Sequence, residues 1–390
     1  MQRVSRIPVK KAKHVDKFGM LILEDGTIFE GMGFGYSTAA FGEAVFNTGM
    51  TGYTEALTDP SYNGQILTLT YPLVGNYGVP DPSVRDADGI LKNFESENIQ
   101  ARGLVVHELS LTASHWNLLL TLDEWLYNEK IPGISGIDTR ELTTKLRTEG
   151  VMMSALEVSD NPIDAKELKK KLDSAKKYND EEFMNIVSTK EPQTFGTESE
   201  SIVVIDTGVK NAILRNVRNL GYKVIKVPWD SSFEKILSYK PKGVIFSNGP
   251  GDPIKCLETM KTAKEIIEKD IPTLGICLGA QILGLASGAN TYKLKYGHRG
   301  QNKSCINLDN NQVYVTSQNH GYCIDPKSLK NTDFKLWFTN ADDKTVEGIK
   351  HKQKQIIAVQ FHPEASPGPF DCMFIFEELK KLIGEGNAKR

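Results

Sequence analysis

The strongest constraint on the fold lies between residues 201 and 286, where short apolar runs alternate with stretches of helical spacing. Continuous apolar runs without polar alternation are typical of strands buried on both faces of a parallel sheet. Two of these runs end in glycine-rich turns, SNGPGDP (247–253) and GICLGAQ (275–281). The sequence therefore predicts an α/β domain over residues 202–390. Its largely parallel sheet is covered by helices on both faces, and ligands bind beyond the carboxyl ends of its strands.

A different domain is expected over residues 18–158. Two apolar runs near its start meet at Asp25-Gly26, and this dipeptide favours a tight hairpin because glycine readily takes a positive φ angle. Glycine and aromatic residues then alternate through short turns, and QILTLTY (65–71) has the clearest strand character. The pattern predicts a mixed α/β domain with a substantial sheet. A chain of 390 residues is long enough for two or three domains.

Residues 136–150 of this first domain are expected to form a helix. Asp138 or Thr139 can cap its first turn, Glu141 can complete a capping box, and Gly150 marks its end.

The two domains are separated by residues 159–201, which are rich in Lys, Glu, Asp and Asn. Pro162 suits the first position of a helix, so a charged helix is predicted to open there. Residues 188–201 are polar and contain Pro and Gly, which indicates an interdomain linker. At the start of the chain, residues 1–17 carry six Lys or Arg and one Asp. This composition favours a disordered basic tail over an organelle-targeting segment, and it contains no apolar signal-peptide core.

Composition narrows the classes of partner. A formal net charge of -2 gives no reason to expect nucleic acid, and no apolar stretch approaches the length of a membrane helix. The five cysteines form no C-x-x-C pair and are odd in number, which argues for a reducing compartment, here taken to be the cytoplasm. The seven histidines show no metal-ligand spacing, so no metal site is predicted.

Cys277, in the turn GICLGAQ, has two interpretations. Free cysteine is among the most buried residue types, so Cys277 could be an ordinary core thiol. A strand–turn–helix junction would instead place it at a helix N-terminus, where the helix dipole favours the reactive thiolate. That arrangement is the cysteine counterpart of the G-x-S-x-G nucleophile elbow. The motif alone does not decide between the two.

A partner for such a thiol follows the apolar run IIAVQF near the C-terminus, in His362-Pro363-Glu364. Residues two apart in an extended segment point to the same side, so Glu364 can orient His362. A nucleophile, a base and an orienting carboxylate form the constellation of nucleophilic catalysis. We therefore expect His362 to take the proton of Cys277.

The turn SNGPGDP lies at the end of the preceding parallel strand. A plain turn is the simple interpretation, but an acyl-transfer site also needs backbone N–H groups to bind an oxyanion. Glycine allows the backbone to approach a ligand closely, whereas proline has no N–H to donate. The candidates for the two oxyanion donors are the N–H groups of Gly251 and Leu278.

Together, SNGPGDP, GICLGAQ and FHPEASPGP resemble a class I glutamine amidotransferase domain, with the match running from residue 202 to about residue 385. Members of that family hydrolyse glutamine through a cysteinyl thioester and pass ammonia to a partner. The stretches 45–78 and 133–147, with SQNHGY (317–322), narrow the resemblance to the small-subunit family of carbamoyl phosphate synthetase. This resemblance covers nearly the whole chain from Phe18.

The resemblance implies roles for individual residues: Cys277 is the nucleophile, His362 the base and Glu364 its partner. The implied glutamine-binding residues are Gly49, Gly249, Gly251, Leu278, Gln281, Asn319, Gly321 and Tyr322. Three positions depart from the usual family pattern: Gly49 stands where serine is frequent, Ala280 where histidine is frequent, and Tyr322 where phenylalanine is frequent. None of these changes removes a catalytic group, so we expect at most an altered glutamine affinity of about 1 kcal/mol.

The resemblance also implies how the activity is used. The chain itself would need no cofactor. A large subunit, in a heterodimer or higher oligomer, would use the ammonia with bicarbonate, ATP and Mg to make carbamoyl phosphate for arginine and pyrimidine synthesis. Three other interpretations stay open: the glutaminase subunit of another synthase, a regulatory non-catalytic subunit, and a free-standing hydrolase of γ-glutamyl or peptide substrates.

Overall fold

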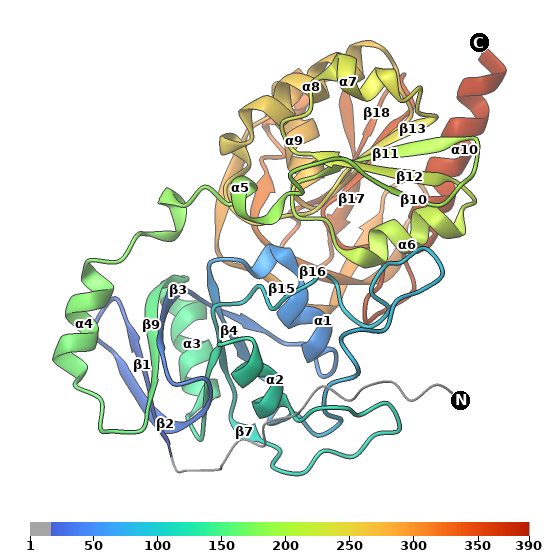
Figure 1. Cartoon of the computed structure of the whole chain (residues 1–390). Helices are drawn as coiled ribbons and strands as arrows, with labels where there is room; N and C mark the ends of the chain where they lie inside the picture. The colour runs from blue at the N-terminus through green and yellow to red at the C-terminus, as the bar shows by residue number, and fades with distance from the viewer. Residues whose placement is uncertain (1–16, 390) are drawn as a thin grey trace, which may run out of the picture.

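A computed structural model describes residues 17–389 of the chain, with side chains up to residue 384. The predicted basic tail falls outside the described residues except for Lys17, which begins the first strand. The fold has two parts: a barrel built from the first half of the chain, and a large sheet with flanking helices built from the second half (Figure 1). Within the described residues, no helix is long and apolar enough to cross a membrane.

The first part is a closed barrel whose strands follow the order β1-β2-β8-β6-β4-β3-β9. The strands are β1 Lys17–Leu23, β2 Ile28–Gly35, β3 Ala39–Asn47, β4 Gln65–Leu69, β6 Gly103–Val105, β8 Pro132–Ser135 and β9 Met152–Ser159. Around them lie α1 Tyr53–Thr58, η1 Pro60–Tyr62, α2 Leu122–Asn128 and α3 Thr139–Glu149, and the short strands β5 Leu73–Val74 and β7 Glu108–Leu109 pair separately. Closure leaves the barrel without free strand edges.

Two local sequence signals in this half predict the observed structure: the Asp25-Gly26 turn and the cap of α3. The β1–β2 hairpin turns at Asp25-Gly26, where Gly26 takes a φ of 90°. In α3, the Asp138 side chain accepts a hydrogen bond from the N–H of Glu141 at 2.8 Å, and Gly150 ends the helix. Both features are confirmed, and Asp138 rather than Thr139 is the cap.

The charged segment departs from expectation in two places. Its helix α4 (Ala165–Asp173) begins three residues after Pro162, because the Asp164 side chain caps it by accepting from the N–H groups of Lys166 and Glu167. The prediction that Pro162 occupies the first helical turn is therefore wrong. Beyond η2 (Tyr178–Asp180) and α5 (Met184–Val187), residues expected to be linker form β10 (Gln193–Phe195), which pairs antiparallel with β12.

The second part is a ten-stranded sheet of order β10-β12-β11-β13-β14-β19-β18-β17-β15-β16. Its strands after β10 are β11 Ser201–Asp206, β12 Lys223–Pro228, β13 Gly243–Phe246, β14 Thr273–Ile276, β15 Thr291–Asn307, β16 Gln312–Ile324, β17 Phe334–Asn340, β18 Val346–His351 and β19 Ile356–Val359. Strands β12, β11, β13, β14 and β19 run parallel, and the strands flanking them pair antiparallel.

Both faces of the sheet are covered, which confirms the α/β fold class. The helices are α6 Asn211–Asn219, α7 Phe233–Ser238, α8 Leu257–Glu268, α9 Leu278–Ala286 and α10 Phe374–Lys389, with short turns η3 Pro253–Lys255 and η4 Ser328–Asn331. Successive residues of β11 enter different cores: Val203 and Ile205 pack with α7, α8 and α9, whereas Ile202 and Val204 pack with α6 and α10. This explains why β11 is apolar at every position.

The two parts meet where the long strand β15 reaches the barrel. The Lys293 ammonium lies 2.6 Å from the Glu43 carboxylate of β3. Deeper in, the Asn319 amide donates to Asp59 at 3.0 Å, and the Asn248 amide donates to the Ser61 hydroxyl at 2.9 Å. These buried bonds join the barrel to the carboxyl edge of the parallel strands, which is where the predicted site lies.

Candidate active site

Cys277 is held at the junction of β14 and α9. It is 2% exposed, and its backbone adopts φ 53° and ψ -106°, a conformation that residues other than glycine rarely take. Its N–H donates to the carbonyl of Val359 on the neighbouring strand at 2.8 Å, and its thiol points at the carbonyl of Asn319, with 3.7 Å between sulfur and oxygen. Strained, over-determined residues of this kind cluster at functional sites.

The flanking glycines are required by this turn. A Cβ on Gly275 would lie 2.7 Å from Leu283, and a Cβ on Gly279 would press against the carbonyl oxygen of Phe246. The first turn of α9 therefore lies directly on β13, and the sequence Gly-x-Cys-x-Gly is what allows that approach.

His362 and Glu364 follow β19 at the same edge of the sheet, and both are buried. The Nδ1 atom of His362 lies 2.6 Å from Oε1 of Glu364, so the predicted pairing of these two side chains is present. The N–H of His362 donates to the carbonyl of Ser317 at 2.8 Å, which fixes the backbone. Within the described residues the Nε2 atom of His362 has no hydrogen-bond partner.

Burial tends to lower the pKa of His362, but the Glu364 carboxylate and the adjacent Cys277 thiol outweigh it and raise the pKa to about 10. The imidazole is therefore held in its charged form near neutral pH. An imidazolium beside a cysteine sulfur favours the thiolate, which is the nucleophilic form.

Lys210 is a functional candidate that the sequence analysis missed. Its ammonium lies 2.9 Å from Oε1 of Glu364, and its side chain is only 5% exposed. Although burial would raise the pKa of Glu364, Lys210 and His362 together hold it well below its usual range. Lys210 follows β11 in the turn before α6, so its place at the carboxyl edge of a parallel strand was the available signal.

The two predicted oxyanion donors differ in their present bonding. Leu278 opens α9, and within the described residues its N–H makes no hydrogen bond. The N–H of Gly251 donates to the hydroxyl of Tyr178 at 3.2 Å. Tyr178 belongs to the segment between the two parts of the chain, and nothing in that charged stretch pointed to a residue of the site.

The pocket beside Cys277 brings together most of the predicted glutamine-binding residues. It is lined by Gly249, Gly251, Gln281, Asn319, Gly321 and Tyr322. Side chains from the barrel line the same pocket, among them Glu43, Ser61 and Gln65. Asp59, another residue that the sequence analysis missed, holds the Asn319 side chain. No sequence signal connects two positions so far apart in the chain.

Two of the departures from the family pattern lie away from this pocket. Gly49 lines a neighbouring hollow with Asn47 and Gln301, and its N–H donates to Oδ1 of Asn47 at 2.6 Å. Ala280 is packed in the core on the face of the sheet covered by α7 and α8. Only Tyr322 of the three faces the pocket, and its hydroxyl donates to the Asn179 side chain at 3.3 Å.

Comparison with known proteins accounts for both parts of the chain. The model for Glutamine amidotransferase class-I matches residues 203–382, and the model for Carbamoyl-phosphate synthase small chain, CPSase domain, matches residues 21–156. A carbamoyl phosphate synthase small chain of Pyrococcus furiosus is 45% identical over 374 residues, covering 95% of this chain and 98% of its own. The chain belongs to the carbamoyl phosphate synthase small-chain family.

Other members show the same extent of similarity. The small chains of Sulfurisphaera tokodaii and Methanocaldococcus jannaschii are each 47% identical, and they cover 94% and 93% of this chain. The alignments cover 96% and 98% of those relatives, so the similarity is not confined to the amidotransferase half. The family resemblance drawn from the motifs is confirmed, and the chain is a glutamine amidotransferase subunit.

Proposed function

We propose that this chain hydrolyses L-glutamine to glutamate and ammonia at Cys277, and that it delivers the ammonia to the large subunit of a carbamoyl phosphate synthase. The observation that carries this proposal is the buried line Lys210–Glu364–His362 ending beside the Cys277 thiol. A nucleophile, a base and an orienting carboxylate meet at one edge of the sheet, next to a pocket of amide and backbone groups suited to a small polar substrate.

In the proposed reaction the sulfur of Cys277 attacks the side-chain amide carbon of glutamine. Before the attack, Nε2 of His362 holds the proton of the Cys277–His362 pair. His362 gives this proton to the nitrogen as the carbon–nitrogen bond breaks and ammonia leaves. Water then attacks the thioester with His362 as base, and glutamate departs with the thiol restored. The N–H groups of Leu278 and Gly251 are the proposed donors to the oxyanion in both steps.

Glutamine is proposed to bind through its amide and its α-substituents to the residues that line the Cys277 pocket. The Lys293–Glu43 pair at that pocket supplies one charge of each sign, which suits a zwitterionic amino acid. Released ammonia would pass to the large subunit without entering bulk water. There it would react with bicarbonate at the expense of ATP bound with Mg, and the product would serve arginine and pyrimidine synthesis in the cytoplasm.

The test uses the complex reconstituted with its large subunit. Cys277→Ser is expected to abolish carbamoyl phosphate synthesis from glutamine and to leave synthesis from added ammonia intact. If both activities fell together, Cys277 would hold the structure of the complex and the proposed role would be refuted. The isolated chain should hydrolyse glutamine slowly and faster with the large subunit, and equal rates would refute the coupling.

The same measurements separate the alternatives. A regulatory subunit without catalysis would show no glutaminase activity in either setting, although both Cys277 and His362 are present and adjacent. A free-standing hydrolase would cleave γ-glutamyl or peptide substrates without a partner. The glutaminase subunit of another synthase would fail to support carbamoyl phosphate synthesis with the large subunit.

A further inference from the structure

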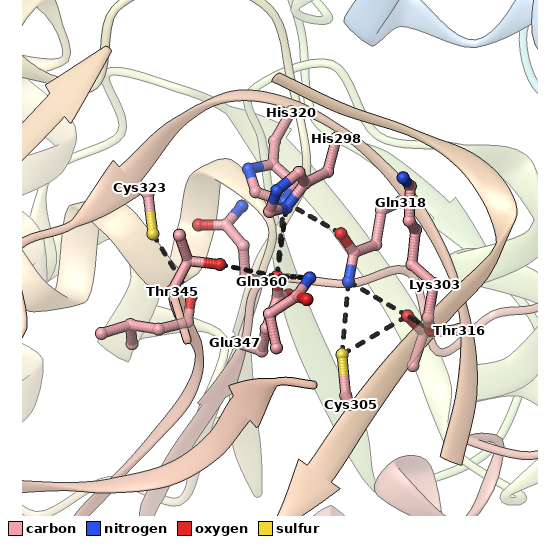
Figure 2. Close-up of polar contacts among 12 residues, drawn as sticks. His298, Lys303, Cys305, Thr316, Gln318, His320, Cys323, Thr345, Glu347 and Gln360 are labelled. Carbon is pink, nitrogen blue, oxygen red and sulfur yellow. Dashed lines mark hydrogen bonds and ion pairs between the residues drawn. The ribbon is translucent and has the colours of Figure 1, made fainter. Parts of the chain in front are cut away.

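A buried cluster is formed by His298, His320 and Glu347, which take no part in the proposed chemistry (Figure 2). His298 on β15 stands directly opposite His320 on β16, and Glu347 belongs to β18. Their imidazole rings meet edge to face, with centroids 5.0 Å apart. Glu347 is fully buried, and a buried carboxylate needs a compensating positive charge.

Ion-pair distances identify His298 as that charge. Its Nε2 atom lies 2.8 Å from the Asp343 carboxylate, and its Nδ1 atom lies 3.3 Å from Oε1 of Glu347. Two carboxylates beside one ring stabilise its charged form, although among the described residues only Nε2 makes a hydrogen bond and Nδ1 makes none. Although burial would lower it, the pKa of His298 is raised, because Glu347 and Asp343 stabilise the imidazolium.

The ring of His320 is held at both nitrogens. Its Nδ1 atom lies 2.8 Å from the carbonyl of Tyr322, and its Nε2 atom lies 3.4 Å from Oε1 of Gln318. That nitrogen lies 3.9 Å from Oε1 of Glu347. Burial, with the positive charges of His298 and Arg299 nearby, holds the pKa of His320 well below its usual range.

This arrangement reaches the glutamine pocket through one carbonyl group. The carbonyl of Tyr322 accepts from Nδ1 of His320 and also from the amide of Gln281, each at 2.8 Å. The amide of Gln281 also donates to Oε1 of Gln360 at 3.0 Å, and the N–H of Gln360 donates to the carbonyl of Glu347 at 2.8 Å. Gln281 is therefore supported from His320 through the Tyr322 carbonyl and from the backbone of Glu347 through Gln360. His320 itself lines the pocket, between Asn319 and Gly321.

We propose that the buried His298–Glu347 pair is a positioning device for glutamine binding: it fixes the orientation of the His320 ring through the edge-to-face contact and thereby holds Tyr322 and Gln281 in their binding positions. The inference rests on the proposed glutaminase function. Neither His298 nor Glu347 lines the Cys277 pocket, so both act through the residues they hold. Loss of the pair should weaken glutamine binding more than it slows the chemical step.

The decisive variant is Glu347→Gln, which removes the charge and keeps the size of the side chain. The glutaminase KM of the variant complex should rise about tenfold while kcat stays within about twofold, because the variant removes the charge that holds His298 against His320. Glu347→Asp, which keeps the charge, should restore part of the loss. An unchanged KM, or an equal fall of kcat and kcat/KM at unchanged KM, would overturn the inference.

His351→Gln is the matched control. His351 is also a buried histidine of β18, but its Nδ1 atom accepts only from the backbone N–H groups of Gln353 and Lys354. We expect this variant to melt at a lower temperature and to keep the wild-type KM. Should His351→Gln raise KM as much as Glu347→Gln does, general loosening of the strand would explain both results and the inference would fall.

A second measurement needs only the wild-type chain. In ¹⁵N-histidine spectra at about pH 6.5, the ordinary pKa of histidine, the ring of His298 should be mostly protonated at both nitrogens. Its signals are assigned by their absence from His298→Gln. A neutral His298 would overturn the proposal. So would an equimolar transition metal in the purified chain, because the three side chains are close enough together to ligate one. A wild-type chain without glutaminase activity would instead refute the proposed function, which keeps the two failures distinct.

Discussion

The ammonium of Lys210 lies 2.9 Å from the Glu364 carboxylate, and both side chains are buried beside His362. Glu364 thus sits between two cations and carries the only negative charge of this trio. Lys210 follows β11, so the position of the Glu364 side chain depends on that segment as well as on its own. The orientation of His362 therefore depends on a lysine far away in the sequence.

Replacing Lys210 with methionine should damage both stability and catalysis. Breaking a buried ion pair from one side leaves a charge uncompensated, and we expect the free energy of unfolding to fall by about 3 kcal/mol. The glutaminase kcat should fall as well, because Glu364 is then held only by His362. Urea denaturation and a glutaminase assay measure the two effects.

The double variant Lys210→Met/Glu364→Gln provides the control. Because it removes both charges, its loss of stability should be smaller than the sum of the two single losses. Strict additivity would show that the two side chains do not interact energetically.

Acid should weaken the contribution of Glu364. The pKa of Glu364 in the folded chain is below its ordinary value of about 4.3, so its stabilising effect is complete above that pH and is lost as the pH falls toward the folded-state pKa. The difference in unfolding free energy between the wild type and Glu364→Gln should be constant from pH 6 to pH 5 and shrink toward pH 3. Urea titrations at these pH values measure it.

In the wild type, His362 does not titrate in this range. Its pKa is raised to about 10, so its own contribution is complete below about pH 6.5 and is lost only as the pH rises through about 10. A difference that grew on acidification would contradict the assignment of Glu364 as the ionised partner.

Tyr178→Phe should increase the glutaminase activity of the isolated chain. Its hydroxyl accepts the N–H of Gly251, a proposed oxyanion donor, at 3.2 Å. Removing the competing acceptor releases that donor, and one neutral hydrogen bond of about 1 kcal/mol corresponds to about a fivefold gain in kcat/KM. Steady-state kinetics with glutamine tests this.

Tyr77→Phe is the comparison for that variant. Its hydroxyl also accepts a backbone N–H, that of Gly52 at 2.8 Å, but Tyr77 lines the hollow that contains Gly49. If activity rose in both variants, or in neither, the Tyr178 hydroxyl would not control whether the N–H of Gly251 is free to bind the oxyanion.

Gly279→Ala should inactivate the enzyme, because the added methyl group would press against the carbonyl oxygen of Phe246 and push the first turn of α9 away from β13. Overpacking of this kind destabilises a fold by about 1–3 kcal/mol, and here the displaced turn carries Cys277. Gly284→Ala on the same helix would meet only the end of the Ile324 side chain at 2.9 Å. A melting curve and a glutaminase assay of both variants decide whether the effect is specific to position 279.

A structural feature can be predicted from the sequence when the interactions that form it are local in the chain. Cys277, His362 and Glu364 lie in short motifs after apolar strands, and strand direction alone brings such ends together. Capping at Asp138 and the hairpin at Gly26 are also local, and both were predictable. Pro162 was misread because the competing cap, Asp164, gives the stronger start signal for that helix.

Asp59, Tyr178 and Lys210 were missed for a different reason. Each acts on a residue brought close only by the packing of separate segments: Asn319 for Asp59, Gly251 for Tyr178 and Glu364 for Lys210. The antiparallel strands β15 to β18 likewise carry polar residues on buried positions, such as Glu347, and a hydropathy pattern does not mark these as interior.

The barrel residues that line the Cys277 pocket have a consequence for protein engineering. An amidotransferase half cut from this chain at residue 202 would retain Cys277, His362 and Glu364 but lose the wall formed by Glu43, Ser61 and Gln65. A chimera that joined this half to a foreign synthase would inherit the proposed catalytic residues with an open pocket beside Cys277. The unit that can be transplanted is therefore the two-part chain, and the boundary of its active site does not follow the boundary between its folds.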